Sequence, residues 1–184
     1  MTPSVTVQVG KSKLELVQGD IAAQDTEAVV NAANSRLAPG AGVAGAIHRA
    51  AGPGLAAECR TLNGCATGEA KLTGGHLLRA RYVIHTVGPV YGHHEDEATL
   101  LRNCYQHSLE LASAHHVRTI SFPAVSTGIF GYPVVEAART ALSTAVAYLC
   151  AHPDLALIRF VLWDAHTFEV HRKVLEEMGL DQSA

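Results

Sequence analysis

The sequence contains few charged and few aromatic residues. Asp, Glu, Lys and Arg make up 17% of its 184 residues and Phe, Trp and Tyr 5%, whereas 48% are hydrophobic. An intrinsically disordered chain has the opposite balance, so this composition predicts a globular domain. The net charge of −3, with 11 histidines counted as neutral, provides no basic excess for phosphate backbones. We therefore expect no nucleic-acid partner.

Cysteine spacing and long apolar runs exclude further classes. No two of the four cysteines lie at C-x-x-C spacing, so neither a zinc ribbon nor a thioredoxin-like motif is predicted. We expect no metal site, no cofactor, and free thiols that pack as small apolar groups. Residues 1–11 lack the apolar segment of a signal peptide, and no apolar run reaches membrane-spanning length. These features predict a cytoplasmic protein without a membrane partner.

The hydrophobic pattern predicts strands that alternate with helices. We expect strands at 5–9, 14–20, 28–34, 69–75, 81–89, 118–125 and 157–163, and helices at 43–52, 53–62, 95–116, 133–152 and 166–178. The run at 28–34 is nearly all apolar, which is typical of an inner strand covered on both faces. This order predicts an α/β protein: one domain over residues 1–184, built as a three-layer α/β/α sandwich around a central mixed β-sheet.

Ligands in such sheets bind outside the carboxyl ends of the strands, and the first candidate position follows the strand at 14–20. Asp20 comes directly after this strand. Its carboxylate could accept a hydrogen bond from an exocyclic amine, such as that of adenine. An aspartate at this position is also typical of a turn or a helix cap, and the dipeptide Gly19-Asp20 alone favours that structural interpretation.

The second candidate position follows the apolar strand at 28–34, which ends with Asn31 and Asn34. Gly40, Gly42 and Gly45 come next and would let backbone N–H groups approach a ligand. The positive end of the following helix favours an anion there. The spacing matches neither the triphosphate-binding P-loop nor the dinucleotide fingerprint. A turn rich in small residues for packing is an equally good interpretation.

The third candidate position is the stretch PAVSTGIFGYP at 123–133. Ser126, Thr127, Gly128 and Gly131 could form a second backbone cradle, and two facing cradles would suit a diphosphate. A hydrolase nucleophile elbow requires glycine two residues before the serine. Ala124 occupies that position, so a serine hydrolase is not favoured.

Taken together, these segments resemble the macrodomain fold, and within it the MacroD-type class. The resemblance covers roughly residues 14–175. It rests on seven colinear motifs: QGDI (18–21), VVNAANS (29–35), GAIHRAAG (45–52), CATGEA (65–70), VIHTVGP (83–89), CYQHSLELA (104–112) and FPAVSTGIFGYP (122–133). It implies a cleft for ADP-ribose across the carboxyl end of the sheet. It also implies hydrolysis of the bond between ADP-ribose and a protein carboxylate, or of O-acetyl-ADP-ribose, so that mono-ADP-ribosylated proteins would be the partners.

The resemblance also assigns roles to residues. Asp20 and Ile21 would lie at the adenine, and Trp163 would stack on it unless this tryptophan belongs to the core. Asn34 would bind the distal ribose, against which Phe130 would pack. The two diphosphate loops would be formed by Gly40, Gly42 and Val43 in the first, and by Ser126, Thr127, Gly128, Ile129 and Gly131 in the second.

One position departs from the MacroD-type pattern. The family loop usually reads G-G-G-V-D-G, whereas this chain has Ala44 in place of the aspartate thought to position or activate water. We expect catalysis, if retained, to depend on Asn34, His48 and Phe130 and on water held by the pyrophosphate of the substrate. A His48 packed under the loop is the favoured structural interpretation. The alternative function is a catalytically inactive module that binds ADP-ribose.

Overall fold

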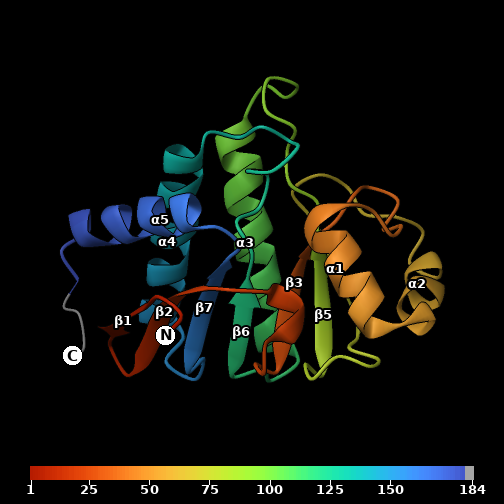
Figure 1. The fold of residues 1–184 in the computed structure, drawn as a ribbon, viewed down its shortest axis with the longest axis horizontal. Helices are drawn as coiled ribbons and strands as arrows, with labels where there is room; N and C mark the ends of the chain where they lie inside the picture. Colours follow the sequence, from red (N-terminus) through yellow and green to blue (C-terminus); the bar gives the residue numbers. More distant parts are fainter. Residues whose placement is uncertain (181–184) are drawn as a thin grey trace.

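Strand β3 (Ala28–Ala32) is the nearly continuous apolar run, and it lies inside the sheet between β6 (Thr119–Phe122) and β5 (Tyr82–Thr86). The computed structural model describes residues 1–180. Its sheet has the strand order β1-β2-β7-β6-β3-β5-β4. The remaining strands are β1 (Ser4–Val9), β2 (Ser12–Gln18), β4 (Ala70–Gly74) and β7 (Leu157–Leu162). Only β1 and β4, at the two edges, run antiparallel to their neighbours. The carboxyl ends of the five central strands therefore share one edge of the sheet (Figure 1).

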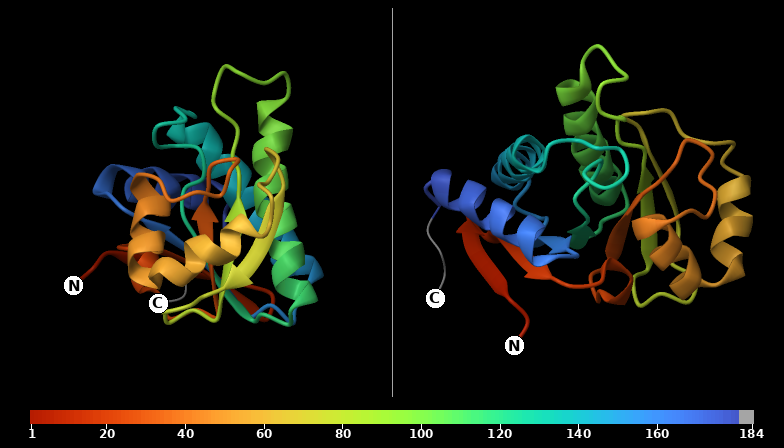
Figure 2. Two further views of the ribbon diagram at one scale, coloured as in Figure 1. Left: turned by 90° about the vertical axis from the view of Figure 1, so that its right-hand side faces the viewer. Right: turned by 45° about the horizontal axis from the view of Figure 1, so that its top comes forward.

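Helices cover both faces of this sheet (Figure 2). One face packs against α3 (Glu97–Ala114), α4 (Val134–Ala151) and α5 (Ala165–Glu177). The other packs against the short 3-10 helix η1 (Ile21–Ala23), α1 (Gly42–Ala51) and α2 (Pro53–Arg60). The predicted α/β/α sandwich with a mixed sheet is confirmed. Sequence patterning failed to predict only η1, which is too short for a periodic signal.

Every strand except β1 ends earlier than predicted, and two of these differences place site residues. Strand β2 ends at Gln18, so that Asp20 caps η1 by accepting a hydrogen bond from the Ala22 N–H at 2.9 Å. Strand β3 ends at Ala32, which places Asn34 in the following loop. Both differences have the same cause: Asp and Asn side chains bond nearby backbone groups and so compete with strand pairing.

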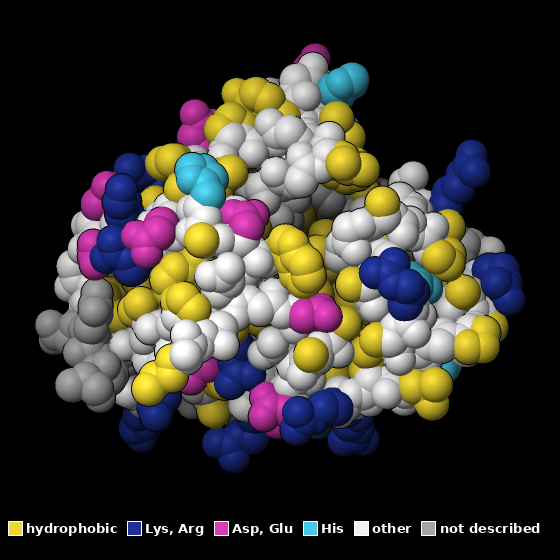
Figure 3. Space-filling model, viewed as in Figure 1, with side chains coloured by type: hydrophobic (Ala, Val, Ile, Leu, Met, Phe, Trp, Pro, Cys, Tyr) yellow, Lys and Arg dark blue, Asp and Glu magenta, His cyan; other side chains and the backbone are white. Residues whose placement is uncertain are grey.

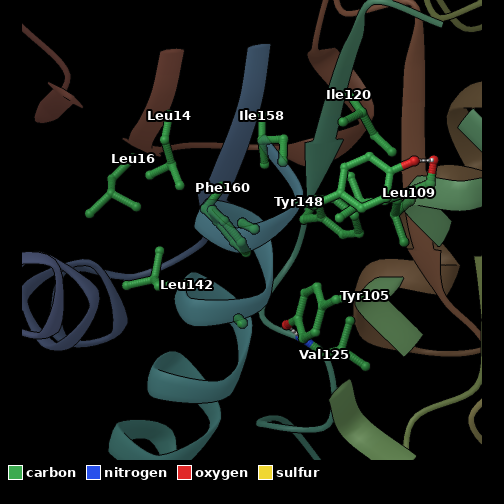
Figure 4. Packing of buried hydrophobic residues seen from close by; sticks show 14 of the residues in the cluster. Leu14, Leu16, Tyr105, Leu109, Ile120, Val125, Leu142, Tyr148, Ile158 and Phe160 are labelled. Carbon is green, nitrogen blue, oxygen red and sulfur yellow. Dashed lines mark hydrogen bonds between the residues drawn. The ribbon is translucent and has the colours of Figure 1, made fainter. Parts of the chain in front are cut away.

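In the larger of two hydrophobic clusters, three aromatic rings from separate elements lie against one another; Figure 4 labels two of them, Tyr105 and Phe160. The rings of Tyr105, Phe122 and Phe160 lie 5.2 to 6.0 Å apart between centroids, within the usual range for favourable aromatic pairs. The hydroxyl of Tyr105 accepts a hydrogen bond from the Val125 N–H at 3.1 Å. Helix α3 therefore fixes the start of the loop after β6 from inside the core.

Replacing Tyr105 by Phe is expected to destabilise the protein, because it leaves the buried Val125 N–H without its acceptor. An unsatisfied buried donor costs about 1–3 kcal/mol. Urea unfolding of Tyr105→Phe measures this loss. Tyr82→Phe is the matched control, since the Tyr82 hydroxyl forms no hydrogen bond within residues 1–180. Equal stability of the two variants would contradict the stabilising role given to the Tyr105 hydroxyl.

Two expectations about apolar groups need correction. Helix α4 is long and apolar enough to cross a membrane, judged by length and composition alone, although no such run was expected from the sequence. The buried core helix of a soluble protein can meet the same test, and α4 packs against α3 and α5 with 44% of its residues buried. Three cysteines are buried as expected, but Cys150 is exposed because it lies on the outer side of α4.

Candidate ligand-binding site

A pocket of about 500 Å³ opens at the carboxyl ends of β2, β6 and β7. Helix α1 supplies one wall through residues spaced three or four apart, which lie on one face of a helix. The loop after β6 supplies the other wall. The lining residues are Gly19, Asp20, Ile21, Gly42, Val43, Ala46, Arg49, Pro123, Ala124, Thr127, Gly128, Val161, Leu162, Trp163, Asp164 and Thr167. Figure 3 shows the hollow on this face of the molecule.

A smaller pocket of about 200 Å³, here called the distal pocket, adjoins the first. The two share Gly42, Val43, Ala124 and Gly128, so they form one continuous groove. The other residues lining the distal pocket are Ala32, Ala33, Ala41, Gly88, Val125, Ser126, Ile129 and Phe130. None of these side chains can act as an acid or a base at neutral pH.

Unpaired backbone N–H groups point to an anion site where the two pockets join. The first N–H groups of α1, from Gly42 to Ala44, have no helical acceptor, because its hydrogen bonds begin with Gly45 N–H to Ala41 O at 3.3 Å. In the facing loop, the N–H groups of Gly128, Ile129 and Phe130 likewise donate to no acceptor within residues 1–180. A β carbon built on Gly42 or Gly128 meets nothing within 4 Å. The space above both cradles is therefore open to a ligand.

The lining of the larger pocket includes Asp20, Ile21 and Trp163, the residues that the resemblance assigns to the adenine. Asp20 uses Oδ1 to cap η1, which confirms the structural interpretation of this residue, while Oδ2 forms no hydrogen bond within residues 1–180. Trp163 is 74% exposed, so the alternative of a core tryptophan is wrong. A carboxylate oxygen and an exposed indole thus lie at the same end of the groove.

Ser126 and Gly88 shape the distal pocket. Ser126 has a left-handed backbone with φ of 66°, and its buried Oγ has no hydrogen-bond partner within residues 1–180. A β carbon on Gly88 would lie 2.0 Å from this oxygen. Gly88 is a site residue that sequence reasoning missed, although it ends the VIHTVG motif. Only glycine allows the second loop to lie this close to the end of β5.

Asn34 and His48 do not line the groove directly. Asn34 holds its own loop together, donating to Ala38 O at 2.9 Å and accepting from Ala38 N–H at 3.1 Å. His48 is 7% exposed, and neither of its ring nitrogens has a partner within residues 1–180. Burial lowers its pKa. Ala44 lies four residues earlier on the same helix face and offers no acceptor. Their predicted catalytic roles stay predictions.

Arg49 was missed by sequence reasoning. It is the cationic side chain in the lining of the larger pocket, and it forms no ion pair within residues 1–180. It follows Gly42 by seven residues on α1, which brings it back to the same face after two turns. The spacing from Gly42 to Arg49 can be seen in the sequence, but it indicates a site residue only once the pocket is known. Within the same residues, no three His, Cys, Asp or Glu side chains are grouped to hold a metal ion.

Comparisons with known proteins decide the family. The Macro domain family model matches residues 30–141. The macro domain-containing protein CT2219 of Chlorobaculum tepidum is 48% identical over 163 residues, which cover 88% of this chain and 95% of that protein. This chain belongs to the Macro domain family.

The MacroD-type resemblance and the fold are confirmed by further matches. Human ADP-ribose glycohydrolase MACROD2 is 46% identical over 94% of this chain, which spans 42% of that longer protein. The Oceanobacillus iheyensis macrodomain with ADP has a TM-score of 0.94 at 38% identity, covering 97% of each chain. The Trypanosoma brucei macrodomain in complex with ADP-ribose has a TM-score of 0.84 at 43% identity, covering 88% of this chain and 68% of that one.

A buried polar network lies behind the site of this macrodomain. His85 on β5 bonds Asn31 through Nδ1 at 3.1 Å and Thr73 Oγ1 through Nε2 at 2.9 Å. The Asn31 side chain is buried in this network, whereas Asn34 lies in the loop that follows the strand. Burial lowers the pKa of His85 to about 4, with a smaller contribution from His48.

Acidification is expected to destabilise this macrodomain through His85. The pKa of a histidine is 6.5 in the unfolded chain, and the pKa of His85 in the folded protein is about 4. Between these values the unfolded chain binds more protons, so the stability falls as the pH falls. From pH 7.5 to pH 5 the loss from this group is about 2 kcal/mol. Urea unfolding at both pH values measures it, with His85→Gln as the control. If the free energy of unfolding of His85→Gln falls by the same amount between the two pH values, the loss does not come from His85.

Proposed function

We propose that this macrodomain binds ADP-ribose along the groove. The adenine lies at Asp20 and Ile21 beside Trp163, and the diphosphate lies between the two sets of unpaired N–H groups. The distal ribose enters the distal pocket beside Phe130. The observation that carries this proposal is the pair of facing cradles at the junction of the two pockets. Their N–H groups and the positive end of α1 complement two linked phosphates without lysine.

We further propose that the protein hydrolyses mono-ADP-ribosyl esters on acidic residues of proteins, O-acetyl-ADP-ribose, or both. The human and mouse relatives named ADP-ribose glycohydrolase support a hydrolase. In the protein ester, cleavage at the anomeric carbon develops an oxocarbenium-like charge and needs a water held on one face of the sugar. Since the distal pocket has no titratable side chain, a pyrophosphate oxygen of the substrate itself orients that water. Asn34 and His48 support the loop around it, and Phe130 holds the ribose.

A turnover assay tests this proposal. A protein mono-ADP-ribosylated on acidic residues is incubated with high concentrations of the macrodomain, and released ADP-ribose is measured against buffer. Calorimetry with ADP-ribose is run on the same sample. Saturable binding with slow release is the expected result. Binding without release above buffer would rule out the proposed hydrolase activity. No binding at millimolar ADP-ribose would rule out the proposed binding site.

The second candidate function is a reader that binds ADP-ribose without cleaving it. The observation in its favour is the absence of any carboxylate or imidazole among the residues that line the distal pocket, together with Ala44. A positioned base is worth a factor of about 10²–10⁴ in rate, which is enough to separate an enzyme from a binding module. The same pair of measurements distinguishes the two functions.

A further inference from the structure

Exposed apolar side chains lie on Ile129, which lines the distal pocket, and on the neighbouring segments that hold Tyr91 and Val135. Ile129 is 92% exposed, and Tyr91 and Val135 are each about half exposed. These residues come from separate segments that the backbone joins: the Tyr91 N–H donates to Phe130 O at 2.9 Å, and the Tyr91 ring meets Tyr132 edge-on with centroids 5.2 Å apart. An apolar surface next to a pocket is typical of a site that contacts another molecule.

Acidic side chains lie on the same surface. Asp96 caps α3 through Thr99 N–H, and Glu97 accepts from the His93 N–H at 3.0 Å. By contrast, Glu95 and Glu136 are exposed and form no hydrogen bond or ion pair within residues 1–180. Burial raises the pKa of Tyr132, and the charges of Glu136, Glu97 and Asp96 together with Tyr91 raise it further, so these carboxylates act on the same residue. Arg102 is the cation next to Asp96.

The upper part of Figure 3 shows apolar and acidic side chains together, without Lys or Arg between them on this face. The adjoining pocket carries an independent sign of a ligand. The Oγ of Ser126, a residue that is 6% exposed, has no partner within residues 1–180 and lies in the wall of the distal pocket. A buried hydroxyl without a partner is rare unless a ligand or water completes its hydrogen bonding.

The outer rim is defined here as the surface formed by Tyr91, Glu95, Ile129, Val135 and Glu136. We propose that the outer rim docks the polypeptide that carries the ADP-ribosyl group and prefers a basic residue beside the modified acid. The inference rests on the proposed function. Because the distal ribose occupies the distal pocket, the attached polypeptide leaves the groove across the outer rim. Its apolar atoms cover Ile129 and Val135, and its Lys or Arg meets the free carboxylates of Glu95 and Glu136. Charge complementarity of this kind selects partners more than it adds affinity.

Two mono-ADP-ribosylated peptides test the inference. They are identical except that the modified glutamate is flanked by two lysines in one and by two glutamates in the other. Binding is measured by fluorescence polarisation with the full chain at low and high salt. The lysine peptide is expected to bind about five- to tenfold more tightly at low salt, since each exposed ion pair contributes little, and the preference shrinks as salt screens the charges.

Variants assign the preference to the outer rim. Glu95→Gln with Glu136→Gln is expected to abolish it and to leave the affinity for free ADP-ribose unchanged. Asp154→Asn with Glu110→Gln removes the same charge elsewhere on the surface and is the matched control. Val135→Asn is expected to weaken both peptides alike.

The outcomes separate the two proposals. Failure to bind free ADP-ribose overturns the proposed function. Normal binding of ADP-ribose with equal affinity for both peptides overturns the docking surface alone, as does a preference that survives in the rim variant. A dimer of the unmodified protein that the rim substitutions dissociate would assign the surface to a second copy of this chain and overturn the inference as well.

Discussion

Ala44→Asp is expected to raise the hydrolysis of a mono-ADP-ribosylated acidic substrate about 100-fold, within the range that a positioned base contributes. Ala44 is buried in the first turn of α1, where unpaired N–H groups and the helix dipole favour a carboxylate. The residue lies near the loop that holds the substrate: a β carbon on Gly40 would be 3.6 Å from Asn34 Nδ2 and 3.8 Å from Ala44 Cβ.

The substitution is also expected to supply His48 with a hydrogen-bond acceptor. Both ring nitrogens of His48 lack partners within residues 1–180, and an aspartate four residues earlier lies on the same helix face. The pKa of His48, followed by NMR, should therefore rise from its lowered value. This rise comes from a new partner and does not depend on turnover, so it reports on the geometry separately from the rate.

Ala44→Asn is the control for the rate, because asparagine has the same shape and cannot accept a proton. Calorimetry with ADP-ribose must show that all three proteins bind equally. If Asp and Asn change the rate by the same factor, the effect is steric. If Ala44→Asp leaves the rate unchanged while binding is intact, the missing carboxylate does not limit this chain.

Gly128→Val is expected to weaken ADP-ribose binding by about 100-fold or more, equivalent to nearly 3 kcal/mol. Gly128 lines both pockets, and a β carbon there meets no atom within 4 Å. The valine side chain would therefore extend from this open position into the space proposed for the diphosphate. The folded state should tolerate the change, so the melting temperature in the absence of ligand is expected to stay the same.

Calorimetry and thermal unfolding of Gly128→Val measure the two effects separately. Ala151→Val, at the exposed end of α4, adds the same side chain away from the groove and should alter neither. Gly88→Ala provides the contrast, since its β carbon would collide with Ser126 Oγ; we expect it to lower both the melting temperature and the affinity. Unchanged ADP-ribose affinity in Gly128→Val would mean that the diphosphate does not lie between the cradles.

Local sequence signals predicted most of the architecture. The apolar run of β3, the alternation in β1 and the helical spacing in α3 each arise from neighbours close in sequence, so they can be read without the fold. Asp20 and Asn34 could not be placed as well, because each side chain bonds a backbone group two to four residues away. Such short-range bonds end a strand without altering the hydrophobic pattern.

The candidate site was predicted in part. Its glycine loops and Trp163 were named from the motifs. Gly42, Gly128 and Trp163 line the groove, whereas Gly40 and Gly131 are not among its lining residues. Arg49, Gly88 and the free carboxylates of Glu95 and Glu136 were not recognised. Arg49 looks like an ordinary surface cation of a helix, and Gly88 like an ordinary turn. Their relevance depends on what faces them in the folded chain. Arg49 faces the pocket between α1 and the loop after β6, and Gly88 faces the side chain of Ser126.

The sequence by itself determined the strands and helices, the class of fold and the absence of a carboxylate at position 44, because these depend on residue type and local spacing. The tertiary structure alone decided that two glycine loops 80 or more positions apart face each other. They do so because the strands that precede them, β3 and β6, are neighbours in the sheet. The tertiary structure also decided that, among residues 1–180, the ring nitrogens of His48 and the hydroxyl of Ser126 have no hydrogen-bond partner. Burial and partnership are properties of the space around a side chain, and that space is created only when distant segments pack together.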